Sequence, residues 1–232
     1  KANEIENNVE VLYGVLEKMR KTRYGLTQDS VRIVHIGDSH VRGHIFPQTT
    51  SDLLKKEFGA VSYIDIGVNG AICTTFVTDE LIGKIRKANP ELLILSFGTN
   101  ESHNLKYNDV IHYGQIDELV ESLKSYFPNT PIILTTPPGS YQSFKRRRRA
   151  RVYTVNPRTS KAAKTIKKYT EQNNLLLWDL YNIAGGEKAS NNWYKANLMR
   201  GDRIHYLPDG YILQGNLLFQ AIIKAYNSYV NL

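Results

Sequence analysis

Five short apolar runs, separated by segments with helical spacing, constrain the fold more than any other feature of this sequence. The runs are rich in β-branched residues and leucine. A strand that reads as a continuous apolar run is buried on both faces, and strands that alternate with helices form parallel sheets. The pattern therefore predicts an α/β fold, a three-layer α/β/α sandwich around a flavodoxin-like five-stranded parallel sheet. The predicted strands occupy residues 31–36, 61–66, 92–97, 131–136 and 175–180.

The segments between the runs predict amphipathic helices. One begins after Asn108, which can cap its first turn, and ends before Pro128. Residues 159–172 and 210–226 have similar spacing, and an apolar stripe predicts a further helix over residues 4–20. A chain of 232 residues is long enough for one well-buried domain, and it shows no internal repeat or linker. We therefore expect a single domain, residues 1–232, with the N-terminal helix packed on it.

Composition argues against several classes of protein. No apolar run approaches the ~20 residues that span a bilayer, so we expect no transmembrane segment. The sequence opens at Lys1 directly on an amphipathic pattern, and no signal peptide is evident in it. Cys73 is the only cysteine, which excludes an internal disulfide and a cluster of thiolate metal ligands.

The formal net charge is +8, and much of the excess is local. The run KRRRRAR, residues 145–151, contains six of the 30 lysines and arginines. Such a run is compatible with a solvated loop or with a surface that binds an anionic polymer. Because it follows the fourth predicted strand, we hypothesise that Arg146, Arg147, Arg148 and Arg149 attract an anionic polymer such as a cell-wall glycan. Aromatic residues are hardly interleaved with the run, so no nucleic-acid partner is expected.

Small and polar residues gather where the predicted strands end. In doubly wound sheets, ligands bind beyond the carboxyl ends of the strands, so the loops at these ends are the candidates for function. The topology would bring these loops together at one edge of the sheet. They are GDSH (37–40), GVNGA (67–71), GTNE (98–101) and, before the last helix, GDRIHYLPDGY (201–211).

These loops contain the groups that a serine-dependent ester hydrolase requires. Such an enzyme needs a hydroxyl nucleophile, a histidine base, a carboxylate that orients the histidine, and donors for the oxyanion. Ser39 supplies a hydroxyl, and Asp202 and His205 can meet across one turn. The N–H groups of Ser39 and Gly70, with the side-chain amide of Asn100, are candidate oxyanion donors. A serine after a strand often only caps the next helix, so the combination favours a nucleophile where Ser39 alone would not.

The same residues resemble the four blocks of the SGNH (GDSL-type) hydrolases, a family named for Ser, Gly, Asn and His. The resemblance spans residues 31–220 and implies the SGNH hydrolase fold, with no cofactor and no metal. His40 stands where the family often has leucine, and the G-x-S-x-G elbow of α/β-hydrolases is absent. The matching blocks are GDS at 37–39, Gly70, Gly98-x-Asn100 and Asp202-x-x-His205. By resemblance, Ser39 is the nucleophile, His205 the base, Asp202 the orienting acid, and Ser39, Gly70 and Asn100 form the oxyanion hole.

The C-terminal half carries a finer resemblance. WDLYNIAGG (178–186) and SNNWYKANLMRGDRIHYLPDGY (190–211) resemble bacterial envelope SGNH esterases that remove O-acetyl groups from peptidoglycan or related glycans. The resemblance implies an acetylesterase of the bacterial periplasm, cell envelope or exterior that acts on an acylated carbohydrate. Trp193, close to the Asp202 block, is the tryptophan that we expect to touch a glycan.

Two alternatives remain open from the sequence. One is a lipid-acting esterase or thioesterase of the same family, which long-chain ester preference would reveal. The other is a non-catalytic module that binds an anionic polymer through the Arg-rich loop. His40 and His44 have a spacing that can hold a metal on a helix, but no third ligand matches, so no metal site is predicted. His35 is expected to be a packed residue.

Overall fold

The computed structural model describes residues 1–145 and 150–232 and contains the predicted parallel sheet. Its five strands run in the order β2-β1-β3-β4-β7, and every neighbouring pair is parallel. The predicted α/β fold class is thus confirmed. The strands are β1 (Val31–Gly37), β2 (Val61–Gly67), β3 (Leu92–Ser96), β4 (Ile132–Thr135) and β7 (Leu176–Trp178).

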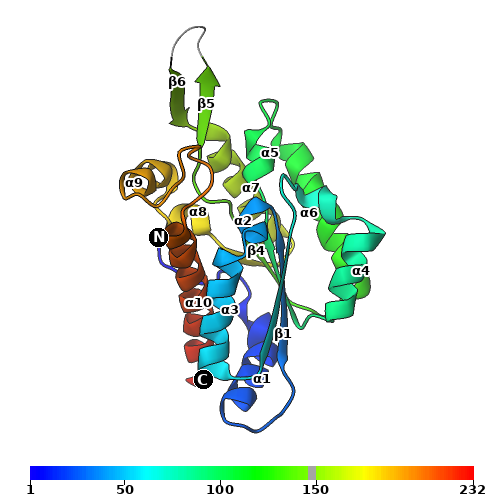
Figure 1. The fold of residues 1–232 in the computed structure, drawn as a ribbon. Helices are drawn as coiled ribbons and strands as arrows, with labels where there is room; N and C mark the ends of the chain where they lie inside the picture. The colour runs from blue at the N-terminus through cyan, green and yellow to red at the C-terminus, as the bar shows by residue number, and fades with distance from the viewer. Residues whose placement is uncertain (146–149) are drawn as a thin grey trace.

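Helices cover both faces of the sheet and complete three layers (Figure 1). Side chains alternate between the two faces along each strand, so each strand contributes side chains to two hydrophobic cores, one on each face of the sheet. Ile33 and Ile94 pack with the first group of helices, whereas Val34 and Leu95 pack with the second. The first group is α1 (Tyr13–Arg23), α3 (Ile45–Phe58) and α10 (Pro208–Val230); the second is α4 (Asp79–Ala88), α6 (Asp109–Tyr126) and α7 (Pro157–Gln172).

Three of the four predicted helices are confirmed, with the local signals that start them. Asn108 accepts a hydrogen bond from the backbone N–H of Ile111 at 3.0 Å and caps α6 as predicted. Asn156 caps α7 in the same way, and Pro157 and Pro208 occupy the first turns of α7 and α10, where a missing N–H costs nothing. Within the described ranges, no helix is both long and apolar enough to cross a membrane.

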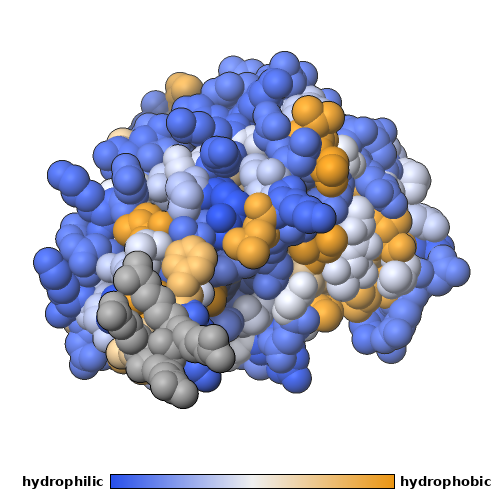
Figure 2. All heavy atoms as spheres, turned by 90° about the horizontal axis from the view of Figure 1, so that it is seen from above, coloured by the Kyte–Doolittle hydropathy of each residue, from blue (hydrophilic) through white to orange (hydrophobic). Residues whose placement is uncertain are grey.

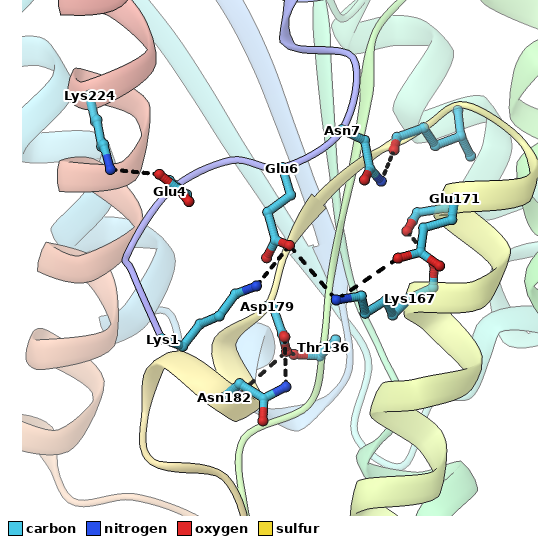
Figure 3. A network of polar contacts seen from close by, with 12 residues as sticks. Lys1, Glu4, Glu6, Asn7, Thr136, Lys167, Glu171, Asp179, Asn182 and Lys224 are labelled. Carbon is cyan, nitrogen blue, oxygen red and sulfur yellow. Dashed lines mark hydrogen bonds and ion pairs between the residues drawn. The ribbon is translucent and has the colours of Figure 1, made fainter.

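The helix predicted over residues 4–20 is displaced. A 3-10 turn, η1 (Val9–Leu12), precedes α1, and residues 1–8 form no helix. Glu6 forms an antiparallel bridge with Leu177, which adds this segment to the free edge of β7. The side chain of Glu6 also pairs with Lys1 at 2.9 Å and Lys167 at 4.0 Å (Figure 3). Edge pairing therefore replaces the helical turn that the apolar spacing suggested.

The fifth predicted strand, residues 175–180, is shortened at its end. Asp179 leaves the strand and caps α8 (Leu180–Ile183) by accepting a hydrogen bond from Asn182 N–H. Its carboxylate also accepts from the hydroxyl of Thr136 at 3.0 Å, so the turn is fixed to the end of β4 (Figure 3).

A two-stranded antiparallel hairpin projects beyond the carboxyl edge of the main sheet (Figure 1). It consists of β5 (Tyr141–Lys145) and β6 (Arg151–Val155), and the Arg-rich run lies between them. The sequence analysis predicts no strand in these two segments. The remaining short elements are α2 (Ser39–Arg42), η2 (Cys73–Phe76), α5 (Thr99–His103), η3 (Gly186–Lys188) and α9 (Ala189–Lys195).

The strand order reverses between β1 and β3, because the chain moves from β1 outward to β2 and then returns to β3 on the other side. Such a switch point opens a crevice at the carboxyl ends of the strands. The short helix α2 packs closely against the last residue of β2. A Cβ atom at Gly67 would lie 2.1 Å from the backbone nitrogen of Arg42, so only glycine permits this packing. The fold therefore presents the loops after β1, β2 and β3 at one place.

Candidate active site

Ser39 is the first residue of α2, directly after β1, and its side chain is half-buried. The cap of this helix is Asp38, whose carboxyl accepts a hydrogen bond from His40 N–H at 2.9 Å. The helix-cap role that the sequence left open for Ser39 thus belongs to its neighbour. Burial raises the pKa of Asp38 to about 8.

His205 and Asp202 lie on a tight loop between α9 and α10. Asp202 Oδ2 accepts from His205 Nδ1 at 2.9 Å, and its other oxygen accepts from the backbone N–H groups of Ile204 and His205 at 2.9 and 3.0 Å. Burial opposes ionisation of this carboxyl, but the three hydrogen bonds together lower the pKa of Asp202. The carboxylate is thus held ionised and bound to one fixed nitrogen of the ring.

The loop brings the other ring nitrogen to Ser39. His205 Nε2 lies 2.9 Å from Ser39 Oγ, although the two residues are 166 positions apart in sequence. Ser39, His205 and Asp202 therefore form one connected chain of hydrogen bonds. With Nδ1 donating to the carboxylate, Nε2 is free to accept the serine proton, which is the arrangement that turns a hydroxyl into a nucleophile.

The candidate oxyanion donors lie in the loops that follow β1, β2 and β3. As the first residue of a helix, Ser39 has an N–H without an intrahelical acceptor. Gly70 is exposed with φ +74°, its N–H donates to none of the described residues, and a Cβ there would meet nothing within 4 Å. Asn100 Nδ2 donates one hydrogen to the carbonyl of Ala71 at 2.9 Å, which leaves its second hydrogen available and ties α5 to the Gly70 loop.

Comparison with protein families gives this geometry its context. The model of the GDSL-like lipase/acylhydrolase family matches residues 35–213, well over half of the chain. The chain belongs to this family. It is accordingly a carboxylic-ester hydrolase of the GDSL type, and the residues that connect in the crevice lie within the matched region. No curated protein matches the chain in sequence.

Solved structures share the fold of this GDSL-type hydrolase. One described as a peptidoglycan O-acetylesterase has 14% identity, covers 97% of this chain and 99% of its own, and superposes with a TM-score of 0.85. A GDSL-like lipase from Bacteroides thetaiotaomicron has 23% identity, coverage of 92% and 99%, and a TM-score of 0.61. A lipase/acylhydrolase from Enterococcus faecalis has 20% identity, coverage of 82% and 95%, and a TM-score of 0.59.

His40 lies against the candidate base, which the sequence did not reveal. Its ring is buried and its centroid lies 5.5 Å from that of His205. His40 Nδ1 is 2.9 Å from the hydroxyl of Tyr211 on α10. Burial lowers the pKa of His40 to about 3, so the ring stays neutral and lies next to His205, tilted by 44°, without adding charge.

Glu101, whose role was not predicted from the sequence, connects the loops that carry Gly70 and Asn100. The buried carboxyl of Glu101 accepts from the backbone N–H groups of Cys73 at 3.0 Å and Gly98 at 2.9 Å. It thus joins the segment after Gly70 to the turn before Asn100. Donor atoms of Cys73, Glu101 and His112 lie within 4.8 Å of one another and are the candidate metal ligands among the described residues. Burial raises the pKa values of the thiol and the carboxyl, and both carboxyl oxygens already have backbone donors, so the group is best explained as structural.

Trp193 does not occupy the expected position. Only 9% of its surface is exposed, it donates to the carbonyl of Ala184 at 3.1 Å, and its ring packs edge-on against Tyr206, next to His205. So little exposed area offers almost no contact to a glycan, and we correct the prediction: Trp193 supports the His205 loop from the interior. Trp178 is fully buried in the core.

The other residues that the sequence analysis singled out do not form one site. His40 and His44 do not share a helix, since α2 ends at Arg42, and His44 pairs with Asp65 at the surface. His35 is packed as expected, with its ring nitrogens 2.8 Å from Tyr63 Oη and 2.7 Å from Ser96 Oγ. The predicted substrate contacts Arg146–Arg149 lie outside the described residues.

Acid is expected to destabilise the protein through its buried histidines. Burial lowers the pKa of His35 to about 3, against an ordinary value of 6.5. Between these two pH values the unfolded chain binds a proton that the folded chain excludes, so the free energy of unfolding falls as pH falls. The arithmetic of this linkage gives a loss of about 2 kcal/mol for His35 between pH 7 and pH 5.

Urea unfolding of His35→Gln at both pH values tests this expectation. The variant is less stable than wild type at pH 7, because it loses packing, but the deficit shrinks by about 2 kcal/mol at pH 5. Phe46→Leu is the matched control, because the Phe46 ring packs edge-on against His35 and does not titrate. Its deficit is expected to be equal at both pH values. A deficit of His35→Gln that does not change with pH would contradict the explanation.

Proposed function

We propose that this hydrolase removes short acyl groups, above all O-acetyl groups, from a cell-envelope glycan through a Ser39–His205–Asp202 triad. The observation that carries the proposal is the connected pair of 2.9 Å contacts from Ser39 Oγ to His205 Nε2 and from His205 Nδ1 to Asp202 Oδ2. In an acylhydrolase family, a serine so activated at a switch-point crevice is the expected nucleophile.

The steps follow from these positions. Ser39 Oγ attacks the ester carbonyl carbon while its proton passes to His205 Nε2. The oxyanion that forms accepts hydrogen bonds from Ser39 N–H, Gly70 N–H and the free amide hydrogen of Asn100. His205 then gives the proton to the departing alcohol, and an acyl-Ser39 ester remains. Water then attacks the acyl carbonyl carbon while His205 Nε2 takes its proton. His205 returns this proton to Ser39 Oγ as the bond to the acyl carbon breaks, and the carboxylic acid leaves.

Two features support a polar substrate with a short acyl group. The face at the carboxyl ends of the strands is mainly hydrophilic, and its hydrophobic residues form separate spots (Figure 2). The likeness in fold to a peptidoglycan O-acetylesterase supports an O-acetylated envelope glycan as substrate and the cell envelope as location.

The alternatives predict different behaviour. A lipid-acting esterase or thioesterase of this family would need a continuous apolar surface for its acyl chain. A module that only binds an anionic polymer would not require Ser39, His205 and Asp202 to connect, and membership of an acylhydrolase family favours the enzyme. Attraction of an anionic polymer by Arg146–Arg149 stays a prediction.

Ester chain length and glycan acetylation test the proposal together. With p-nitrophenyl esters, kcat/KM is expected to be highest for acetate and lower by about tenfold or more for octanoate. Incubation with O-acetylated peptidoglycan is expected to release acetate, whereas peptidoglycan de-O-acetylated by mild base is the matched control and releases none. Preference for octanoate would instead indicate a lipid-acting enzyme. Acetate ester turnover without acetate release from the glycan would reject the glycan as substrate.

A further inference from the structure

Arg203 lies between Asp202 and His205 in a backbone conformation that arginine rarely adopts. Its φ is +57°, in the left-handed region that glycine and, less readily, asparagine and aspartate tolerate. A residue with a Cβ stays in this region only when its surroundings enforce it. The contacts that enforce this conformation matter for the triad, because Arg203 is one of the two residues between the acid and the base.

The side chain of Arg203 is held in a cage of three tyrosine rings. The guanidinium carbon lies 4.1 Å from the ring centroid of Tyr194, 4.2 Å from that of Tyr153 and 5.1 Å from that of Tyr141. Tyr194 belongs to α9, whereas Tyr141 and Tyr153 lie on the two strands of the hairpin. Within the described residues, Arg203 Nε is buried without a hydrogen-bond partner, and no carboxylate pairs with the guanidinium. Aromatic faces therefore hold the cation.

The backbone of Arg203 is fixed as well. Its N–H donates to the carbonyl of Arg200 at 2.9 Å, and its own carbonyl accepts from Tyr141 N–H at 2.9 Å. The stem of the loop is closed by an antiparallel bridge between Met199 and Tyr206. The loop that carries Asp202 and His205 thus has two attachments, one at its stem and one to the base of the hairpin (Figure 1).

We propose that Arg203 is a positioning residue, and that its tyrosine cage makes the β5–β6 hairpin part of the machinery that aligns His205 with Ser39. The inference rests on the proposed function, since it assumes that the triad performs catalysis. Turnover then depends on the hairpin even for an ester too small to reach it. Removing the cage frees the loop to leave the left-handed conformation, and the 2.9 Å contact between Ser39 and His205 is lost for part of the time.

Steady-state kinetics on p-nitrophenyl acetate test the arginine side of the cage. Arg203→Gly accepts the left-handed conformation but does not enforce it, and we expect kcat to fall by roughly 10- to 100-fold, the scale of a small misplacement of a catalytic group. KM is expected to change by less than about twofold, because binding of this small ester does not involve the cage. Arg200→Ala, an exposed arginine of the same loop, is the matched control and keeps both constants near wild type.

Substitutions of Tyr153, on strand β6 of the hairpin, test the tyrosine side of the cage. Tyr153→Ala is expected to lower kcat as Arg203→Gly does, whereas Tyr153→Phe keeps the ring and rescues turnover. The double variant should be no slower than Arg203→Gly alone, because both changes break one interaction. Val152→Ala, an exposed neighbour on the same strand, controls for damage to the hairpin.

The outcomes separate this inference from the proposed function. Loss of kcat in Arg203→Gly and Tyr153→Ala, rescue by Tyr153→Phe and a non-additive double variant support it. Wild-type kcat in either Arg203→Gly or Tyr153→Ala overturns it, as do equal losses in Tyr153→Phe and Tyr153→Ala. If Ser39→Ala is fully active, the proposed function itself fails. If Ser39 is required and the cage variants turn over normally, only the positioning role fails.

Discussion

Replacing Ser39 with alanine is expected to lower kcat for p-nitrophenyl acetate by a factor on the order of 10⁵, with the folded state retained. The variant loses the oxygen that lies 2.9 Å from His205 Nε2. Among the described residues, no other hydroxyl is hydrogen-bonded to this nitrogen. The oxyanion donors remain, so a small residual rate above that of the uncatalysed reaction is expected.

The fold should tolerate this change. Asp38 and not Ser39 caps α2, so the variant keeps the hydrogen bond to His40 N–H and loses no helix cap. Thermal unfolding is therefore expected within a few degrees of wild type. Ser125→Ala is the matched control, because its hydroxyl only donates to a carbonyl of its own helix at the surface. A Ser39→Ala enzyme with a tenth or more of wild-type kcat would remove Ser39 from the reaction and reopen the binding module as an explanation.

The strands of the main sheet were predictable because each is buried on both faces. Continuous apolar runs identify such strands without any knowledge of their neighbours, and four of the five appear within one residue of their predicted limits. β7 is shorter because Asp179 caps α8 and accepts from Thr136, 43 residues away, which only the fold brings to it. The β5–β6 hairpin was missed because YQSFK and RVYTV mix polar and apolar residues and leave Phe144 and Val152 exposed.

The residues of the candidate site likewise differ in whether a local sequence pattern could reveal them. Ser39, Gly70, Asn100, Asp202 and His205 could be found because each lies in a short motif next to a strand end or a helix start. His40, Glu101 and Arg203 could not, because what they do depends on partners from distant segments. No local pattern states that Glu101 will accept a hydrogen bond from Cys73, or that three tyrosines will surround Arg203. The sequence thus predicts the candidate reacting groups better than the residues that hold them in place.

Replacing Asp202 with asparagine is expected to lower kcat by about 10²- to 10⁴-fold, with little change in KM for p-nitrophenyl acetate. The carboxylate accepts from His205 Nδ1 with one oxygen and from two backbone N–H groups with the other. An asparagine has a single side-chain oxygen, so it can accept from the ring or from the two backbone N–H groups, but not from both. If its NH₂ faces the ring, Nδ1 must become an acceptor, and Nε2 then carries the hydrogen and cannot receive the proton of Ser39. If its NH₂ faces the loop, it opposes the N–H groups of Ile204 and His205.

The lowered pKa of Asp202 keeps its charge available to the ring. Because hydrogen bonds lower that pKa against the effect of burial, the carboxylate stays ionised in mildly acidic solution and still accepts from His205 Nδ1 there. Asp209→Asn, an exposed acid in the first turn of α10, is the matched control for the loss of one negative charge and is expected to keep wild-type kcat. A value of kcat for Asp202→Asn within about threefold of wild type would contradict the orienting role, since the wrong tautomer leaves His205 without a lone pair toward Ser39.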